Sequence, residues 1–244
     1  MSKSMLDLDI SLRSFMKYEL ILFDADGTLF DFEKASEKAI KNGLKNFKLD
    51  RWNSDTMTIY RKVNKQIWDE FELKLISAAD LKTERFRRFF IEISIENVDP
   101  KEFSDYYLHS LSQNTDLING AEDLVKWCYG KFKIGIITNG LTSVQKPRFS
   151  HSILDKYFEH YIISEELGFA KPHGEIFDYS LSKFNHSDKK STIIIGDNLS
   201  SDIKGGNDYG IDTCWINFDN LSSNNILPTY EIKSLDQFKN ILST

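Results

Sequence analysis

The sequence contains few cysteines, no long apolar run and no excess of basic residues, and each of these absences excludes a class of protein. Cys128 and Cys214 are far apart, lie among apolar neighbours and match no metal-ligand spacing, so we expect both to be buried packing residues. No segment approaches the roughly 18 to 20 apolar residues that span a bilayer. The N-terminal segment carries Asp7, Asp9 and Arg13 among its apolar positions and therefore lacks the core of a secretory signal. We expect a cytoplasmic protein with no membrane partner.

A formal net charge of −6 gives no general attraction to nucleic acid polymers or acidic lipids, so any anion-binding site must be built locally. No pair of histidines has metal-ligand spacing, and we interpret all five as surface or packing residues: His109, His151, His160, His173 and His186. What the chain does have is 244 residues, of which 41% are hydrophobic. That is enough for one substantial core, or one core and a smaller satellite domain, and it allows a monomer or a homodimer.

Short continuous apolar runs, rich in branched and aromatic side chains, predict buried parallel strands. They span residues 20–23, 132–137, 161–163, 192–195 and 213–216, with a last edge strand expected near 230–232. Helical patterns lie between the later runs, for example after Pro172, a residue type that suits the start of a helix. This alternation predicts an α/β fold with a doubly wound, Rossmann-like and mostly parallel sheet. In such sheets the active site lies beyond the carboxyl ends of the strands.

The segment between the first two strands is too long for a simple crossover and predicts an inserted bundle of helices. Four stripes of apolar residues at helical spacing lie within it, so we expect a helical cap domain at residues 31–114 and an α/β core domain at residues 1–30 and 115–244. The residues alone leave open whether the first fifteen form an ordered arm, a frayed tail or a start-site overshoot. Six aromatic residues of the insert could stack on a nucleobase, although helical spacing predicts most of them in the bundle core: Trp52, Tyr60, Trp68, Phe71, Phe86 and Phe89.

The residues that follow the first strand carry the strongest signal for chemistry. Asp24 and Asp26 stand two residues apart at the end of that strand and are followed by Gly27 and Thr28. Two carboxylates this close repel unless a cation or a proton lies between them. A Mg²⁺ ion would keep Asp24 ionised for in-line attack on phosphorus, while Asp26 could hold a proton for the leaving alcohol. Thr28 is a candidate for a residue that supports Asp24 and Asp26 from behind the site. The alternative interpretation of the whole segment is an Asx-rich turn between a strand and a loop.

Two weaker signals concern the binding of a phosphoryl group. Thr138 and Asn139 follow the second strand, and Gly140 after them permits close approach of the main chain, so these residues could receive phosphate oxygens. Lys171 stands alone before a predicted helix and could neutralise charge on a phosphoryl group during its transfer. In isolation, the first pattern is also typical of an ordinary turn and the second of a solvated surface lysine.

A further acidic motif follows the apolar strand at 192–195. Mg²⁺ prefers oxygen ligands and keeps some of its waters, so one more carboxylate from a neighbouring strand end would suit it. Asp197 fits that ligand position, and Asp202, about one helical turn later, could support it through hydrogen bonds. The alternative interpretation makes Asp197 a turn residue and Asp202 an acid that complements a helix dipole.

These four motifs together resemble the haloacid dehalogenase (HAD) superfamily of phosphohydrolases, from about Tyr18 to the end of the chain. The resemblance implies a HAD-like core with a cap of the smaller, C1 type, a lid that opens for substrate and closes to exclude water. It implies Asp24 as the nucleophile that forms an aspartyl-phosphate, and Asp26 as general acid/base whose main-chain carbonyl also binds Mg²⁺. The other residues that it implies are the phosphate ligands Thr138 and Lys171, and the metal ligand Asp197 with Asp202 in support.

Within that superfamily, several segments are similar to bacterial pyrimidine 5′-nucleotidases, among them Phe-Asp-Ala-Asp-Gly-Thr-Leu-Phe, Ile-Thr-Asn-Gly and Ile-Ser-Glu-Glu-Leu-Gly-Phe-Ala-Lys-Pro. This similarity implies hydrolysis of small phosphorylated metabolites of the nucleoside monophosphate class, such as UMP, dUMP and dTMP. Gly27 departs from it, since some of those enzymes carry Glu there. Asp26 argues against a dehalogenase, because a halide needs no proton. A phosphatase of a sugar phosphate or phosphoglycolate is the main alternative. A catalytically silent regulatory protein would lack a catalytic group, yet all are present.

Overall fold

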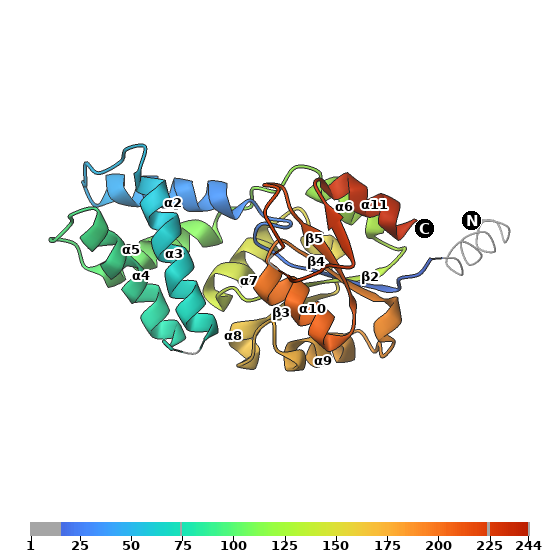
Figure 1. Cartoon of the computed structure of the whole chain (residues 1–244). Helices are drawn as coiled ribbons and strands as arrows, with labels where there is room; N and C mark the ends of the chain where they lie inside the picture. Colours follow the sequence, from blue (N-terminus) through green and yellow to red (C-terminus); the bar gives the residue numbers. More distant parts are fainter. Residues whose placement is uncertain (1–15, 74, 224, 244) are drawn as a thin grey trace.

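The computed structural model describes residues 16–73, 75–223 and 225–243 of the chain (Figure 1). The question about the first fifteen residues therefore lies outside the described part. Cys128 and Cys214 are both buried and free, as expected for packing residues. None of the helices in the described ranges is long and apolar enough to cross a membrane.

Six strands form one sheet in the order β3-β2-β1-β4-β5-β6, and every neighbouring pair is parallel. This confirms the doubly wound parallel sheet. The chain first builds outward from β1 through β2 to β3 and then returns to place β4 on the other side of β1. The crevice at such a reversal is where ligands bind in this kind of sheet. The strands are β1 (Leu20–Phe23), β2 (Lys133–Thr138), β3 (His160–Ile163), β4 (Thr192–Gly196), β5 (Asp212–Ile216) and β6 (Tyr230–Ile232).

Alternate residues of β1 face opposite sides of the sheet, because side chains in a strand alternate between its two faces. Ile21 and Phe23 pack in one apolar cluster, and Leu20 and Leu22 in another. Residues of α6, α7 and α11 complete the first cluster, and residues of α9 complete the second. The sheet is therefore covered on both faces. The α-helices of the α/β core are α6 (Ala121–Cys128), α7 (Thr142–His151), α8 (Ser164–Leu167), α9 (Gly174–Lys183), α10 (Lys204–Tyr209) and α11 (Leu235–Leu242).

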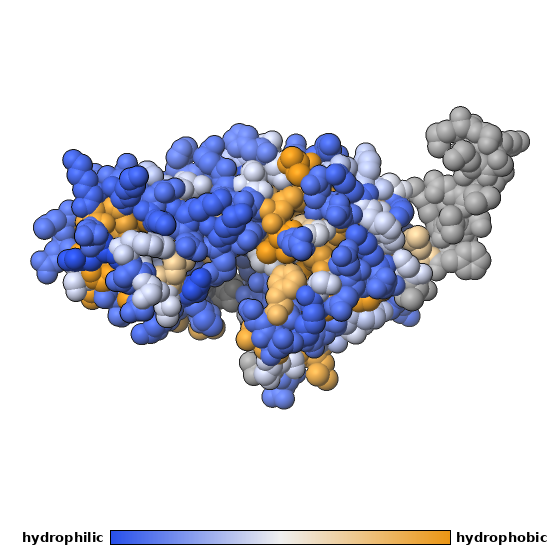
Figure 2. Space-filling model, turned by 90° about the horizontal axis from the view of Figure 1, so that it is seen from above, coloured by the Kyte–Doolittle hydropathy of each residue, from blue (hydrophilic) through white to orange (hydrophobic). Residues whose placement is uncertain are grey.

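The long segment after β1 forms four helices that pack on one another and make a separate lobe (Figures 1 and 2). They share an apolar cluster that includes Tyr60, Phe86 and Phe89, three of the six aromatic residues considered for base stacking. The expected helical insert is thus present, and we propose that it acts as a cap domain over the sheet. The four helices are α2 (Phe32–Asn46), α3 (Thr56–Glu72), α4 (Ala78–Glu92) and α5 (Pro100–Ser112).

Apolar packing and main-chain pairing both join this lobe to the α/β core. Leu141 and Val144, at the start of α7, pack inside the apolar cluster of the helical lobe. The two chain crossings between the lobes are paired as well, since Phe30 forms an antiparallel bridge with Leu117. Helix α7 is therefore packed against both lobes, and it follows the strand end that carries Thr138.

Candidate active site

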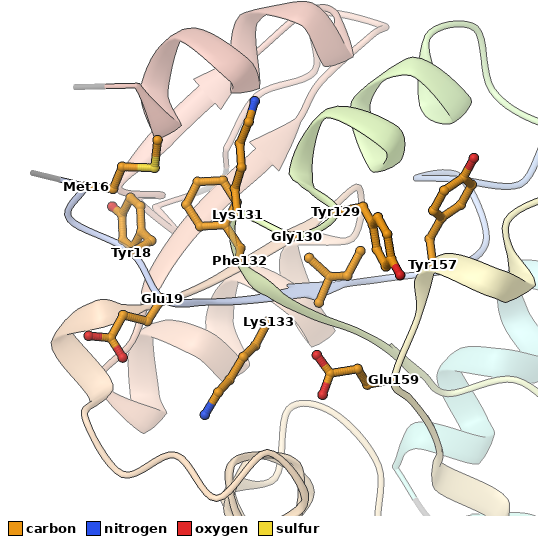
Figure 3. Close-up of a pocket in the computed structure, with 11 residues that line it drawn as sticks. Met16, Tyr18, Glu19, Tyr129, Gly130, Lys131, Phe132, Lys133, Tyr157 and Glu159 are labelled. Carbon is orange, nitrogen blue, oxygen red and sulfur yellow. The ribbon is translucent and has the colours of Figure 1, made fainter. Parts of the chain in front are cut away.

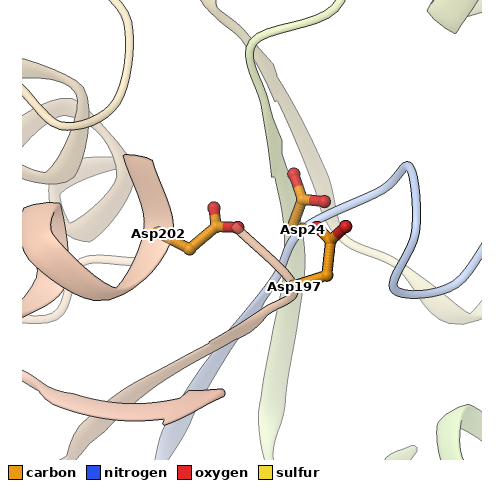
Figure 4. A group of neighbouring side chains, drawn as sticks. All are labelled: Asp24, Asp197 and Asp202. Atoms are coloured by element: carbon orange, nitrogen blue, oxygen red, sulfur yellow. The ribbon is translucent and has the colours of Figure 1, made fainter. Parts of the chain in front are cut away.

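The carboxyl ends of β1 and β4 bring Asp24 and Asp197 together. The two strands are parallel neighbours with Phe23 opposite Ile195, and the main-chain N–H of Asp24 donates to the oxygen of Ile195 over 2.9 Å. One carboxylate oxygen from each of Asp24, Asp197 and Asp202 lies within 4.8 Å of the other two (Figure 4). Three acidic residues singled out in two distant motifs of the sequence therefore lie close together.

Hydrogen bonds hold the segments that carry Asp197 and Asp202. The buried side chain of Trp215, in β5, donates its Nε1–H to the main-chain oxygen of Asp197 over 2.9 Å. Asp202 is buried in the π-helical turn η3 (Leu199–Ile203), where its Oδ2 accepts from the main-chain N–H of Asn198 at 3.1 Å. The turn after β4 thereby folds its second carboxylate back toward the strand end.

Lys171 is buried at the centre of this acidic group. Its ammonium nitrogen lies 2.6 Å from Oδ1 of Asp24 and 2.7 Å from Oδ1 of Asp202, and it also donates to the main-chain oxygen of Ile137 over 2.7 Å. Burial by itself disfavours the charged ammonium, but the carboxylates of Asp202 and Asp24 outweigh it, so the pKa of Lys171 is raised. The side chain is thus a fixed cation rather than a solvated surface lysine.

The nucleophile candidate, Asp24, has a carboxylate that burial makes costly to ionise. Burial raises its pKa to about 7, with Asp202 and Asp26 adding repulsion, although the nearby ammonium of Lys171 acts in the opposite direction. A further cation beside the carboxylate would favour its ionised form. The site therefore has the electrostatic character of a cation-binding centre.

The donor set fits a hard divalent cation such as Mg²⁺. Asp24, Asp197 and Asp202 supply only carboxylate oxygens, the ligand type that Mg²⁺ prefers. When all three are ionised, their negative charge exceeds the single positive charge of Lys171. The excess of negative charge and the oxygen-only chemistry both suit such a cation, and Asp202 belongs to the same group within 4.8 Å as Asp24 and Asp197. Direct binding of the metal by Asp24, Asp197 and the main-chain oxygen of Asp26 stays a prediction.

Thr138 and Asn139 occupy the end of β2, next to the same group. Thr138 is buried, and its Oγ1 accepts from the main-chain N–H of Gly140 at 3.0 Å. The side chain of Asn139 bonds the main chain of Lys171 twice, donating to its oxygen over 2.8 Å and accepting from its N–H at 2.9 Å. In this structure the amide therefore holds Lys171 in place. Binding of phosphate by Thr138, Asn139 and Lys171 stays a prediction.

The turn after β1 explains the presence of glycine at position 27. Gly27 has a φ of +81°, and a Cβ at this position would stand 2.3 Å from Oδ2 of Asp197. A side chain here would therefore be strained and would displace a carboxylate of the site.

Thr28 is fully buried and its hydroxyl has no hydrogen-bond partner among the described residues. Its supporting role stays a prediction.

Asp26 is held by two residues that the sequence motifs did not identify. Gln145 Nε2 donates to its Oδ2 over 2.6 Å, and Arg148 donates to both of its oxygens, Nη1 to Oδ1 over 2.5 Å and Nη2 to Oδ2 over 3.2 Å. Both residues are on α7, three positions apart, and are 1% exposed. The signal available in the sequence was a glutamine and an arginine three residues apart after the Thr-Asn-Gly motif, a spacing that places both on one face of a helix.

Two pockets help to locate the site. An open pocket of about 350 Å³ adjoins the acidic group and is lined by Asp26, Asp197 and the exposed ring of Phe218. A second open pocket, of about 450 Å³, lies at the amino ends of β1 and β2, where Tyr18 and Lys133 line it (Figure 3). The second pocket thus lies at the amino ends of the strands, whereas the acidic residues lie at the carboxyl ends. It is separate from the candidate site.

Comparison with known proteins agrees with this geometry. A sequence model of the haloacid dehalogenase-like hydrolases matches residues 21–216. The chain belongs to this family. The match runs from β1 to β5 and therefore includes every residue of the acidic group. The resemblance seen in the motifs is confirmed, and the protein is a HAD-family hydrolase.

Three relatives cover nearly the whole of this hydrolase. It is 33% identical over 231 residues to the pyrimidine 5′-nucleotidase YjjG of Escherichia coli, a match to 93% of this chain and 99% of YjjG. It is 34% identical to the pyrimidine 5′-nucleotidase PynA of Streptococcus pneumoniae, over 93% and 98% of the two chains. The crystal structure of the HAD-hydrolase YfnB of Bacillus subtilis, bound to magnesium, superposes with a TM-score of 0.87 at 33% identity, over 93% and 100%.

Proposed function

We propose that this protein is a Mg²⁺-dependent phosphomonoesterase that hydrolyses pyrimidine nucleoside 5′-monophosphates such as UMP, dUMP and dTMP. The observation that carries the proposal is the buried pairing of Asp24 with Lys171 beside the carboxylates of Asp197 and Asp202. Similarity to two enzymes named pyrimidine 5′-nucleotidases, over 93% of the chain, supports the choice of substrate.

In the first step, a carboxylate oxygen of Asp24 attacks phosphorus and the bond from phosphorus to the leaving oxygen breaks. Asp26 gives the departing alkoxide a proton, so the nucleoside leaves as an alcohol and Asp24 carries the phosphoryl group. Lys171 remains beside Asp24 and offsets negative charge as the group moves. In the second step, Asp26 takes a proton from water, which attacks phosphorus and releases inorganic phosphate and free Asp24.

A magnesium ion would be held by Asp24, Asp197 and the main-chain oxygen of Asp26, with Asp202 beside them, and it would supply positive charge to the phosphoryl oxygens. Two other residues hold the main chain of the site residues in place. Trp215 fixes the main chain of Asp197, and Asn139 fixes that of Lys171. The relative YfnB has been described as bound to magnesium, which supports the same cofactor here.

The helical lobe supports a nucleoside as the leaving group. Lys82, in the second turn of α4, pairs with Glu165 over 3.2 Å, and Glu165 accepts from the main-chain N–H of Thr142 at 2.7 Å. This end of the lobe therefore lies close to the start of α7, four residues after Thr138 at the end of β2. Trp68 and Phe71, in the last turns of α3, form a partly buried edge-to-face pair with ring centroids 5.7 Å apart. We propose that this lobe closes as a lid and that the pair offers an aromatic surface to the base.

Phosphate release from a substrate panel tests the proposal. UMP, dTMP, ribose 5-phosphate, phosphoglycolate and p-nitrophenyl phosphate would be compared with and without Mg²⁺. We expect the highest kcat/KM for the pyrimidine nucleotides, dependence on Mg²⁺, and loss of activity in Asp24→Asn. Full activity of Asp24→Asn would refute the nucleophile. A preference for the sugar phosphate or phosphoglycolate would replace the nucleotidase assignment with the alternative phosphatase. No activity on any substrate would favour the silent regulatory protein.

A further inference from the structure

Helix α7 fixes the carboxylate of Asp26 through three hydrogen bonds. Three N–H groups reach its two oxygens, two from Arg148 and one from Gln145, at 2.5 to 3.2 Å. A carboxylate has about four sites that can accept a hydrogen. With three of them occupied, one is left, and the other three determine the direction in which it points.

The two residues of α7 are themselves held in place. The guanidinium of Arg148 lies over the ring of Phe30, 5.2 Å from its centroid. Gln145 passes directly over Gly140, where a Cβ would stand 2.2 Å from its Nε2. The glycine of the Thr-Asn-Gly motif therefore makes room for Gln145 to reach Asp26. The positions of both side chains are therefore set by their surroundings: Phe30 packs on Arg148, and the missing side chain of Gly140 leaves space for Gln145.

The main chain that carries Asp26 is also fixed. Hydrogen bonds of 2.9 Å run from Gly27 N–H to the oxygen of Phe30, and from the N–H groups of Leu29 and Phe30 to the oxygen of Ala25. Rotation of the Asp26 side chain is therefore the main freedom left in this turn. The hydrogen bonds from Gln145 and Arg148 restrict this rotation. A bidentate arginine restrains the plane of a carboxylate as well as its position.

We propose that Gln145 and Arg148 are positioning residues that orient the carboxyl group of Asp26 for proton transfer to the leaving oxygen. This inference rests on the proposed phosphatase function. In the first step the proton on the remaining site of Asp26 passes to the leaving oxygen as the bond from phosphorus to that oxygen breaks. In the second step the same site accepts a proton from the attacking water. Neither residue of α7 gains or loses a proton.

The competing explanation is a purely structural ion pair between α7 and the turn after β1. The two explanations differ in how the effect of a mutation depends on the leaving group. An alkyl alcohol such as a nucleoside needs a proton to leave, whereas p-nitrophenolate leaves as a stable anion. The ratio kcat/KM reports the steps up to departure of the leaving group and excludes the later hydrolysis that both substrates share.

The test compares kcat/KM for UMP and for p-nitrophenyl phosphate in wild type, Arg148→Met, Gln145→Leu and Arg148→Lys. General acid/base catalysis contributes about 10²- to 10⁴-fold, so we expect Arg148→Met to lose at least about tenfold on UMP and much less on p-nitrophenyl phosphate. Gln145→Leu should show the same selectivity to a smaller degree, and Arg148→Lys should recover part of the UMP activity. Lys146→Met, on the exposed side of the same helix, is the matched control and should leave both values unchanged.

Equal losses on both substrates, or no loss on either, would overturn the inference while leaving the phosphatase function intact. Gln145→Leu keeps this test decisive if Arg148→Met does not fold, since it removes one donor and no charge. If wild type releases phosphate from neither substrate, the proposed function itself fails and the inference falls with it.

Discussion

Lys171 places its ammonium nitrogen 2.6 Å from the Oδ1 atom of Asp24, and both residues are buried. The main chains of these two residues come from segments 147 positions apart. Asn139 holds the main chain of Lys171 from the end of β2, so two strand ends and the loop before α9 together place one positive charge beside one carboxylate. The pair is the electrostatic centre of the candidate site, and it leads to the first prediction.

Removing the charge of Lys171 should damage both activity and folding. In Lys171→Met the carboxylates of Asp24 and Asp202 lose their shared cation, and breaking a buried pair from one side costs about 3 to 5 kcal/mol. We expect kcat/KM for UMP to fall at least about 100-fold, as when one fixed transition-state donor is removed, and the melting temperature to fall as well. Lys204→Met, which removes an exposed lysine paired with Asp208, is the control. Unchanged stability of Lys171→Met would show that the buried pair is not needed.

Magnesium should stabilise the folded protein through Asp197. A ligand that binds only the folded state at 100 times its Kd adds about 2.7 kcal/mol, so added Mg²⁺ should raise the melting temperature of wild type. Asp197→Asn should abolish this rise, because it removes one of the three clustered carboxylates. Asp219→Asn, in the wall of the adjoining pocket, should retain the rise. The measurement is thermal unfolding against Mg²⁺ concentration, and an undiminished rise in Asp197→Asn would contradict the metal site.

Gly140→Ala should impair the reaction with little loss of stability. The added Cβ would stand 2.2 Å from Nε2 of Gln145, and a flexible side chain can move away at small cost. Gln145 would then leave Asp26, and we expect kcat/KM for UMP to fall while the melting temperature changes little. In the Gln145→Ala background the same substitution should have almost no further effect, because its steric target is gone. Additive losses in the double mutant would show that Gly140 acts in another way.

Trp68→Leu should weaken the binding of a nucleotide more than that of a sugar phosphate. Stacking of a base on an aromatic side chain contributes about 1 to 3 kcal/mol, so the KM for UMP should rise about 5- to 150-fold. The KM for ribose 5-phosphate, which has no base, should stay the same, and Trp68→Phe should retain most of the affinity. An equal rise in KM for the two substrates would exclude stacking on Trp68.

Acid should weaken an ion-pair network on α4. Hydrogen bonding from Arg87, with a further contribution from Arg88, lowers the pKa of Glu84 from 4.5 to about 2. Because the pKa in the folded state is depressed, the stabilisation is complete above about pH 4.5 and is lost as the pH falls toward 2. The side chains are partly exposed, so Glu84→Gln should cost only about 1 kcal/mol at pH 7. Urea unfolding at pH 7 and pH 3 measures this, and a difference from wild type that grew in acid would contradict the sign.

The fold was largely readable from local pattern. Continuous apolar runs predicted β1 to β6 to within one residue or so, and stripes at helical spacing predicted α2 to α5, because periodicity along the chain reflects which faces are buried. The order of the strands was not readable in this way. It depends on which faces pack together, and no pattern within one segment records that.

The candidate site, too, was predictable in part from local sequence pattern and in part only from the packing of the whole molecule. The sequence by itself determined that Asp24, Asp26 and Asp197 follow the ends of buried strands, since a strand end is a local feature and parallel strands bring such ends to one edge. Only the tertiary structure decided that Gln145 and Arg148 reach Asp26 across 119 and 122 positions of the chain. Helical spacing shows that two residues share a face, whereas what that face meets is set by the packing of the whole molecule.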